Sequence, residues 1–147
     1  MDRTASRFPQ LRILCPIMPV VLMLLGVSIP SSFGAEAGRV FELRVYTAQE
    51  GKLDDLHRRF REKTNPLFVK HGISLIAYWT PTDGERSGNT LIYVVGHPSR
   101  EAAKANWKAF GEDPEWKAAY AASIEHGKLV SKVESTFMKA TDYSPLQ

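Results

Sequence analysis

VFELRVYT, residues 40–47, is the stretch that decides the fold. Apolar and polar side chains alternate along it, as they do in a β-strand whose two faces meet different surroundings. One face is apolar and consists of Phe41, Leu43 and Val45. The other face is polar and consists of Glu42, Arg44 and Tyr46. We interpret the apolar face as core and the polar face as a surface that meets either water or an enclosed cavity.

Hydrophobic period and capping signals predict five further elements downstream of this strand. They are a helix over 52–70, strands over 73–80 and 89–96, a helical region that begins at Ser99 and restarts at Asp113, and a strand over 129–139. Pro66 removes a backbone donor inside the first helix, so we expect a kink or a break near Asn65. The resulting β-α-β-β-α-β order is that of a ferredoxin-like α+β domain.

The N-terminus is predicted to be separate from this domain. Arginines at the start, an apolar run of about 15 residues and then small residues are typical of a secretory signal peptide. We therefore expect a signal peptide over 1–37, cleaved after Gly34 or after Ala37, and one domain over 38–147. An uncleaved membrane anchor is the alternative, although a spanning helix needs about 20 apolar residues. The leader places the protein in the periplasm or outside the cell, with only transient membrane contact.

Composition excludes some classes of function once the leader is set aside. Residues 1–35 carry three arginines and one aspartate, so the remainder holds 16 of the 19 basic and 15 of the 16 acidic residues. That even balance does not support a nucleic-acid partner. Cys15 is the only cysteine, so the exported domain would have no disulfide, thiolate metal site or cysteine nucleophile.

A set of short motifs resembles the NIPSNAP family in order and spacing. They lie at 42–47, 51–52, 70–72, 78–80, 89–93, 98–99, 107–110, 113–116 and 142–146, and together span about Val40 to Leu146. The resemblance implies a homodimeric α+β barrel, in which two ferredoxin-like protomers pack their sheets around a shared interior. It implies no settled reaction and no catalytic residues.

In such a barrel, the helices would cover the Phe41 face of the first strand and the polar face would line the dimer interior. Glu42, Arg44 and Tyr46 would then meet alternate residues of the second strand, either Tyr78 or Trp79. Arg44 can bind a carboxylate or an enolate-like oxygen in such a cavity, Tyr46 can donate a hydrogen bond and Glu42 can accept a proton. The alternative is structural, since Glu42 and Arg44 can simply pair with each other.

The histidines add one candidate ligand contact, because His97 ends the third strand and has a possible view of a pocket rim. No two histidines have a metal-ligand spacing, so we expect neither a metal site nor a cofactor. A haem held through His97 or His71 is the alternative. Aromatic residues at helical spacing are interpreted as core or dimer interface rather than as a substrate cage; they are Trp107, Phe110, Trp116 and Tyr120.

The sequence therefore favours an exported homodimer of undefined activity that binds a small apolar or aromatic molecule. The candidate ligand contacts are Glu42, Arg44, Tyr46, Tyr78, Trp79 and His97. Two alternatives stay open: a cofactor-independent oxygenase or isomerase, by analogy of fold alone, and a scaffold that uses its Trp/Phe helix surface to hold a protein partner.

Overall fold

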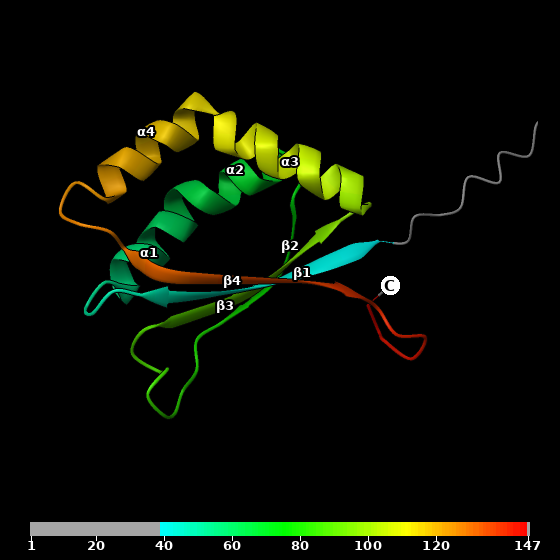
Figure 1. Cartoon of the computed structure of the whole chain (residues 1–147), viewed down its shortest axis with the longest axis horizontal. Helices are drawn as coiled ribbons and strands as arrows, with labels where there is room; N and C mark the ends of the chain where they lie inside the picture. The colour runs from blue at the N-terminus through cyan, green and yellow to red at the C-terminus, as the bar shows by residue number, and fades with distance from the viewer. Residues whose placement is uncertain (1–38, 147) are drawn as a thin grey trace, which may run out of the picture. The chain divides into compact units, whose positions relative to one another are not determined.

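The computed structural model of the chain describes residues 39–146, and the predicted signal peptide lies outside them. The predicted β-α-β-β-α-β order is confirmed (Figure 1). The elements are β1 (Val40–Ala48), α1 (Leu53–Arg59), η1 (Phe60–Thr64), α2 (Asn65–Lys70), β2 (Ser74–Trp79), β3 (Thr90–His97), α3 (Arg100–Glu112), α4 (Pro114–Ser123) and β4 (Val130–Lys139). No helix within 39–146 is long and apolar enough to cross a membrane.

The four strands form one antiparallel sheet in the order β2-β3-β1-β4, which is the ferredoxin-like order. The apolar strand β3 takes an internal position, as its sequence predicts. The helices within residues 39–146 all lie over one face of the sheet, and none of them covers the opposite face (Figure 1). Glu42 of β1 stands in register with Val95 of β3 and with Phe137 of β4, so these side chains share a face.

The predicted orientation of β1 is wrong, because its polar face is the one that the helices cover. The indole Nε1 of Trp107, on α3, donates to Glu42 Oε2 at 2.6 Å. The Arg44 guanidinium lies 4.4 Å from the centre of the Trp107 ring. Tyr46 packs edge-on against Phe60 of η1, with 5.9 Å between ring centres. The apolar side chains of β1 therefore lie on the open face of the sheet.

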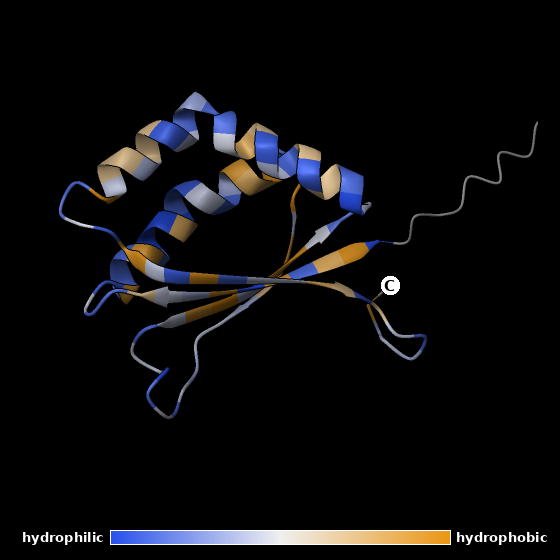
Figure 2. Ribbon diagram, viewed as in Figure 1, coloured by the Kyte–Doolittle hydropathy of each residue, from blue (hydrophilic) through white to orange (hydrophobic). Residues whose placement is uncertain are grey.

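Burial of this polar face is possible because its groups find partners within the core. A buried carboxylate is tolerated when hydrogen bonds and an opposite charge replace water. Glu42 is 2% exposed and has both. Around it lies an aromatic core of sheet and helix side chains, in which Tyr93 of β3 stacks on Tyr78 of β2 with ring planes 11° apart. The hydropathy colouring shows polar and apolar positions mixed along the same strands (Figure 2).

The first helical region passes through a single π-helical turn, η1, where a kink or a break was expected. The Asn65 N–H donates to the carbonyl of Phe60, five residues earlier. Pro66 follows directly, and in a regular α-helix its ring would clash with the carbonyl four residues before it, that of Glu62. The wider turn moves that carbonyl away, so the helix continues. Such turns are often found at functional sites.

Capping signals place the other helix ends as predicted. Ser99 accepts a hydrogen bond from the Ala102 N–H and begins α3, while Asp113 accepts from the Glu115 N–H and begins α4. Gly72 ends α2 with a φ of 72°, the left-handed conformation expected of a glycine C-cap.

Candidate functional site

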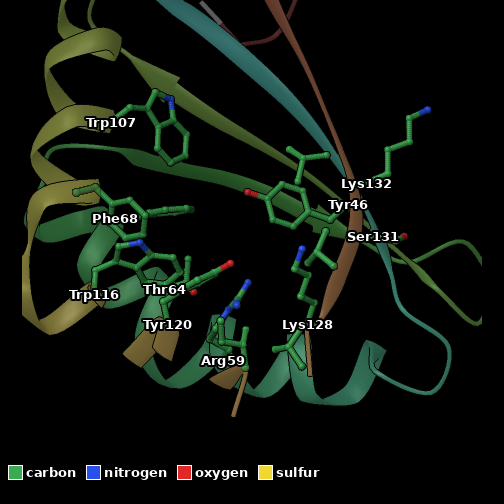
Figure 3. Close-up of a pocket in the computed structure, with 15 residues that line it drawn as sticks. Tyr46, Arg59, Thr64, Phe68, Trp107, Trp116, Tyr120, Lys128, Ser131 and Lys132 are labelled. Carbon is green, nitrogen blue, oxygen red and sulfur yellow. The ribbon is translucent and has the colours of Figure 1, made fainter. Parts of the chain in front are cut away.

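A cavity of about 240 Å³ lies between the helices and the β1–β4 side of the sheet (Figure 3). An apolar cavity of about 150 Å³ holds benzene. This one therefore has room for a ligand of one or two rings. Its lining comes from every layer of the described domain: Tyr46, Arg59, Thr64, Phe68, Trp107, Phe110, Trp116, Tyr120, Ile124, Lys128, Leu129, Val130, Ser131, Lys132 and Val133.

Aromatic side chains of α3 and α4 make the helix wall of this cavity. Phe110 and Trp116 lie with ring centres 4.4 Å apart, and Trp116 lies 5.7 Å from Tyr120. The sequence reading of this stripe as packing is half right. Trp107 and Trp116 do pack on the core, but they and Tyr120 also border empty space.

Arg59 is the residue that the sequence reading missed. It is 8% exposed and lines the cavity from the end of α1. Its guanidinium donates to Ser123 Oγ at 3.1 Å and lies 5.4 Å from the Trp116 ring centre. A signal was present, because Arg59 follows Leu56 by three residues on the stripe that continues to Thr64, whereas Arg58 points outward.

Arg59 and Thr64 reach the same cavity because of the π turn between them. In an α-helix, residues five apart point in well-separated directions. A turn closed by bonds five residues apart brings such residues back to one side. The Thr64 hydroxyl is buried and has no hydrogen-bond partner within the described chain. The π turn thus supplies both a cation and a free hydroxyl to the cavity.

Glu42 forms a polar network behind the cavity wall rather than inside the cavity. It accepts from Trp107 at 2.6 Å and from Ser135 Oγ at 2.5 Å, and it pairs with Arg44 at 3.4 Å. Burial raises the pKa of the Glu42 carboxyl, but the polar groups of His97, Ser135 and Trp107, with the Arg44 charge, together hold this pKa below its ordinary value of 4.5. The structural pairing of Glu42 with Arg44 is therefore confirmed. Its visible effect is to fix the Trp107 indole, which is part of the cavity wall.

His97 does not lie at a pocket rim, which corrects the sequence prediction. It is 0% exposed, and its ring packs between Trp107 and Phe137. It faces the core because His97 lies on the same face of β3 as Val95 and Tyr93, the face that the helices cover. Its Nε2 lies 3.4 Å from Glu42 Oε2 but is not aligned for a hydrogen bond.

The two histidines considered as haem ligands lie in different surroundings. His71 Nε2 is 2.6 Å from Asp113 Oδ2, an oxygen that also accepts from Lys70 Nζ at 2.8 Å. His97 is enclosed in the core. Across residues 39–146, no three His, Cys, Asp or Glu side chains group closely enough to hold a metal ion.

Tyr46 is the predicted site residue that the structure places in the cavity. Tyr78 and Trp79 line a separate, open pocket with His57 at the β2 edge, where the Tyr78 hydroxyl donates to Asn65. Glu42, Arg44 and His97 line neither of these spaces. The six residues therefore do not converge, and a ligand contact by any of them stays a prediction.

Comparison with known proteins gives a family and a fold. The sequence profile of the NIPSNAP family matches residues 41–145. A NIPSNAP family protein from Agrobacterium tumefaciens is 24% identical in sequence, with 74% of this chain and 99% of that chain covered and a TM-score of 0.65. An uncharacterized NIPSNAP-like domain protein from Burkholderia xenovorans is 16% identical, with 74% and 90% covered and a TM-score of 0.65.

A more distant match is weaker in both sequence and structure. SnoaB, a cofactor-independent oxygenase from Streptomyces nogalater, is 12% identical, with 74% of this chain and 98% of that chain covered and a TM-score of 0.49. No curated protein matches the chain. Likeness at this level concerns the course of the backbone, and no residue role is taken from it.

Proposed function

Because this chain belongs to the NIPSNAP family over residues 41–145, and because a partly open cavity lies between its helices and its sheet, we propose that it binds a small aromatic or apolar molecule there. The observation that carries this proposal is the lining itself. Aromatic faces surround the space, and a few polar groups reach into it, which is the usual composition of a small-molecule site. Tyr46 and Tyr120 supply hydroxyl groups, and Trp107 and Trp116 supply stacking surfaces.

The proposal is tested first on the protein as purified. Native mass spectrometry is expected to find a small molecule retained by the protein. The ligand-free protein, prepared by extraction, is expected to bind aromatic probes. The probe for titration is 2-naphthamide, which is neutral and has two fused rings. Trp107 and Trp116 both line the cavity, and Trp79 is the one other tryptophan in the chain. In a Trp79→Phe background, tryptophan fluorescence therefore reports directly on the cavity.

A matched pair of tyrosine substitutions locates the binding. Tyr120→Ala removes part of the cavity wall and is expected to weaken 2-naphthamide binding about three- to tenfold, the worth of an aromatic contact. Tyr143→Ala makes the same chemical change on the C-terminal tail, where Tyr143 is 84% exposed, and is expected to leave binding unchanged. If no ligand is retained and neither neutral nor charged naphthalenes bind saturably, the proposal fails.

We do not place an oxygenase or isomerase ahead of binding. Such an enzyme needs a group that removes a proton from its substrate. The cavity lining contains tyrosine, arginine and lysine side chains but, within the described residues, no carboxylate or imidazole. The scaffold alternative is also less well supported, because Trp107, Phe110 and Trp116 turn inward.

The open face of the sheet supports assembly into a homodimer, which is part of the proposal. Phe41, Leu43 and Val45 of β1 lie on this face. Val94 and Ile92 of β3 stand directly opposite Leu43 and Val45 in register. A contiguous apolar sheet face on a small domain is typical of an interaction surface. A second copy of the same face would cover it. In such a dimer, apolar side chains, and not the Glu42 face, line the contact between the sheets.

Export is proposed from the leader alone. N-terminal sequencing of the protein recovered from the periplasm or medium of its own cells tests it, and a new N-terminus at Ala35 or Gly38 is the expected result. Recovery of the intact N-terminus from the cytoplasm would overturn the proposal.

A further inference from the structure

Arg59 is a buried cation that the protein does not neutralise. It is 8% exposed, and none of the ion pairs within residues 39–146 includes it. One guanidinium nitrogen donates to Ser123, while Nε is buried and has no hydrogen-bond partner in the described chain. Burial lowers the pKa of Arg59, with nearby tyrosines acting in the opposite direction. A guanidinium nevertheless stays charged in proteins, so this site carries an uncompensated positive charge.

Arg44 is the comparison for Arg59, because it is an arginine in a similar aromatic environment that does have a carboxylate partner. Arg44 also lies against a tryptophan ring, but the carboxylate of Glu42 stands 3.4 Å from its guanidinium. Arg59 has the aromatic contacts, to Trp116 and to Tyr120 at 5.5 Å, without any carboxylate. Aromatic faces offset part of the cost of a buried cation, and an unpaired buried charge remains unfavourable. An anion from outside the chain would supply what is missing.

The charge of the whole cavity has the same sign. Lys128 lines it together with Arg59, and their charged ends reach toward the space that the hydroxyl groups of Tyr46 and Tyr120 also border (Figure 3). Lys132 is different, because its ammonium pairs with Glu134 at 2.9 Å and points away in the same view. The cavity therefore combines two available cations with aromatic walls.

The carboxylates that border the same surface pocket as Arg59 do not pair with it. A neighbouring surface pocket shares Arg59 and includes Asp55 and Glu62. Asp55 is held by Lys52 and Arg58, and neither Asp55 nor Glu62 comes within ion-pair distance of Arg59 among the described residues. The cation is thus left free on the cavity side.

We infer that the ligand of this cavity is a small aromatic carboxylic acid, whose ring stacks among Trp107, Trp116 and Tyr120 and whose carboxylate is bound by Arg59. The inference rests on the proposed function, since it names the class of molecule that the cavity takes. The planar fork of a guanidinium fits a carboxylate with two parallel hydrogen bonds. Thr64 adds a buried hydroxyl that can donate to the same end of the ligand.

The test compares two probes that differ in charge alone. Full-length protein with Trp79→Phe is titrated with 2-naphthoate and with 2-naphthamide, and tryptophan fluorescence gives each dissociation constant. Charge-assisted hydrogen bonds are worth enough that the carboxylate is expected to bind about tenfold more tightly or better. Equal affinities would overturn the anion inference and leave cavity binding intact. Failure of both probes to bind would overturn the proposed function, and this inference with it.

Two neighbouring arginines provide the matched variants. Arg59→Met keeps much of the side-chain volume, and is expected to reduce the preference for carboxylate over amide to about threefold or less while 2-naphthamide still binds. Arg58→Met makes the same change at a side chain that is 62% exposed, and is expected to keep the full preference. A preference that survives Arg59→Met would refute the role of Arg59.

A third variant covers a loss of folding in Arg59→Met. Arg59→Lys keeps the charge but loses the planar guanidinium. Its preference for 2-naphthoate over 2-naphthamide is expected to be smaller than that of the wild type and larger than that of Arg59→Met. Circular dichroism checks the fold of each variant. If Arg59→Lys shows the wild-type preference, bidentate recognition is wrong.

Discussion

Glu42→Gln tests whether the polar face of β1 lies under the helices, because the two orientations predict very different costs. In the structure Glu42 accepts hydrogen bonds from Trp107 at 2.6 Å and Ser135 at 2.5 Å. Hydrogen bonds to a charged group are worth about 1.5–3 kcal/mol each. Glutamine keeps one acceptor oxygen, so the equivalent of about one such bond is lost.

The substitution also leaves Arg44 without a counter-charge. Breaking a buried ion pair costs about 3–5 kcal/mol. We take about 1 kcal/mol here, because the two charges are 3.4 Å apart and the Arg44 side chain is 17% exposed. The two effects together predict a loss of about 3 kcal/mol in the free energy of unfolding. That is a large share of the 5–15 kcal/mol typical of a folded domain.

Urea unfolding at neutral pH, followed by far-UV circular dichroism at one fixed protein concentration, measures this loss. Glu112→Gln is the matched control, since Glu112 lies on the outer surface of α3 and its side chain is 65% exposed in its pair with Lys108. A pair of that kind contributes about 0–1 kcal/mol. A double-mutant cycle with Arg44→Met is expected to show a coupling of at least about 1 kcal/mol. If Glu42→Gln costs no more than Glu112→Gln, the assignment of the two faces is refuted.

Three further predictions follow from other features. The pKa of Glu42 is lowered in the folded state, so the stability that its carboxylate contributes is complete above the ordinary pKa of 4.5 and is lost as the pH falls through the folded-state pKa. In urea unfolding experiments, the stability difference between wild type and Glu42→Gln should therefore narrow as the pH falls below 4.5. A difference that widens would contradict the direction of the shift. Val45→Lys is expected to convert the proposed dimer to a folded monomer in light scattering, while Lys104→Glu on the exposed side of α3 leaves the assembly unchanged. A dimer that persists in Val45→Lys would exclude the open face as the interface. Gly72→Ala should lower the free energy of unfolding by about 1–2 kcal/mol in urea, because φ is 72° and the new methyl group would lie 3.3 Å from Asn106; a neutral effect would refute this reasoning.

The order of elements was predictable because its signals are local. Ser99 and Asp113 cap the starts of helices with their own side chains, and Gly72 ends a helix through its left-handed backbone conformation. Pro66 also marks its position, but how the helix accommodates it depends on packing. A break and a π turn both remove the clash, and only the π turn keeps the helix continuous.

Which face of β1 packs under the helices was not predictable. Polar and apolar residues alternate regularly along the strand, and that alternation does not say which set is buried. The deciding contact is the hydrogen bond from Trp107, a residue 65 positions away in sequence. A tryptophan N–H that lands on a carboxylate makes burial of Glu42 favourable, and no local pattern encodes that meeting. Tyr46 does line a cavity, but that cavity lies on the helix side of the sheet and not in the dimer interior where Tyr46 was expected.

Arg59 was missed for a simpler reason, since adjacent arginines on a helix are usually both solvated. The three-residue step from Leu56 placed one of them on the buried stripe. That step alone distinguishes Arg59 from Arg58, since acidic residues at helical spacing, Asp55 and Glu62, flank both arginines.

The π turn makes the cavity sensitive to chain length as well as to residue identity. Such a turn equals an α-helix with one residue added, and each residue advances an α-helix by about 100°. Deleting one residue within 60–64 would let the helix close regularly and would rotate α1 relative to α2 by about that angle. Arg59 would leave the cavity and another side chain of α1 would enter it. A single-codon deletion or insertion can therefore exchange the group that lines the cavity while the sheet and the other helices stay as they are.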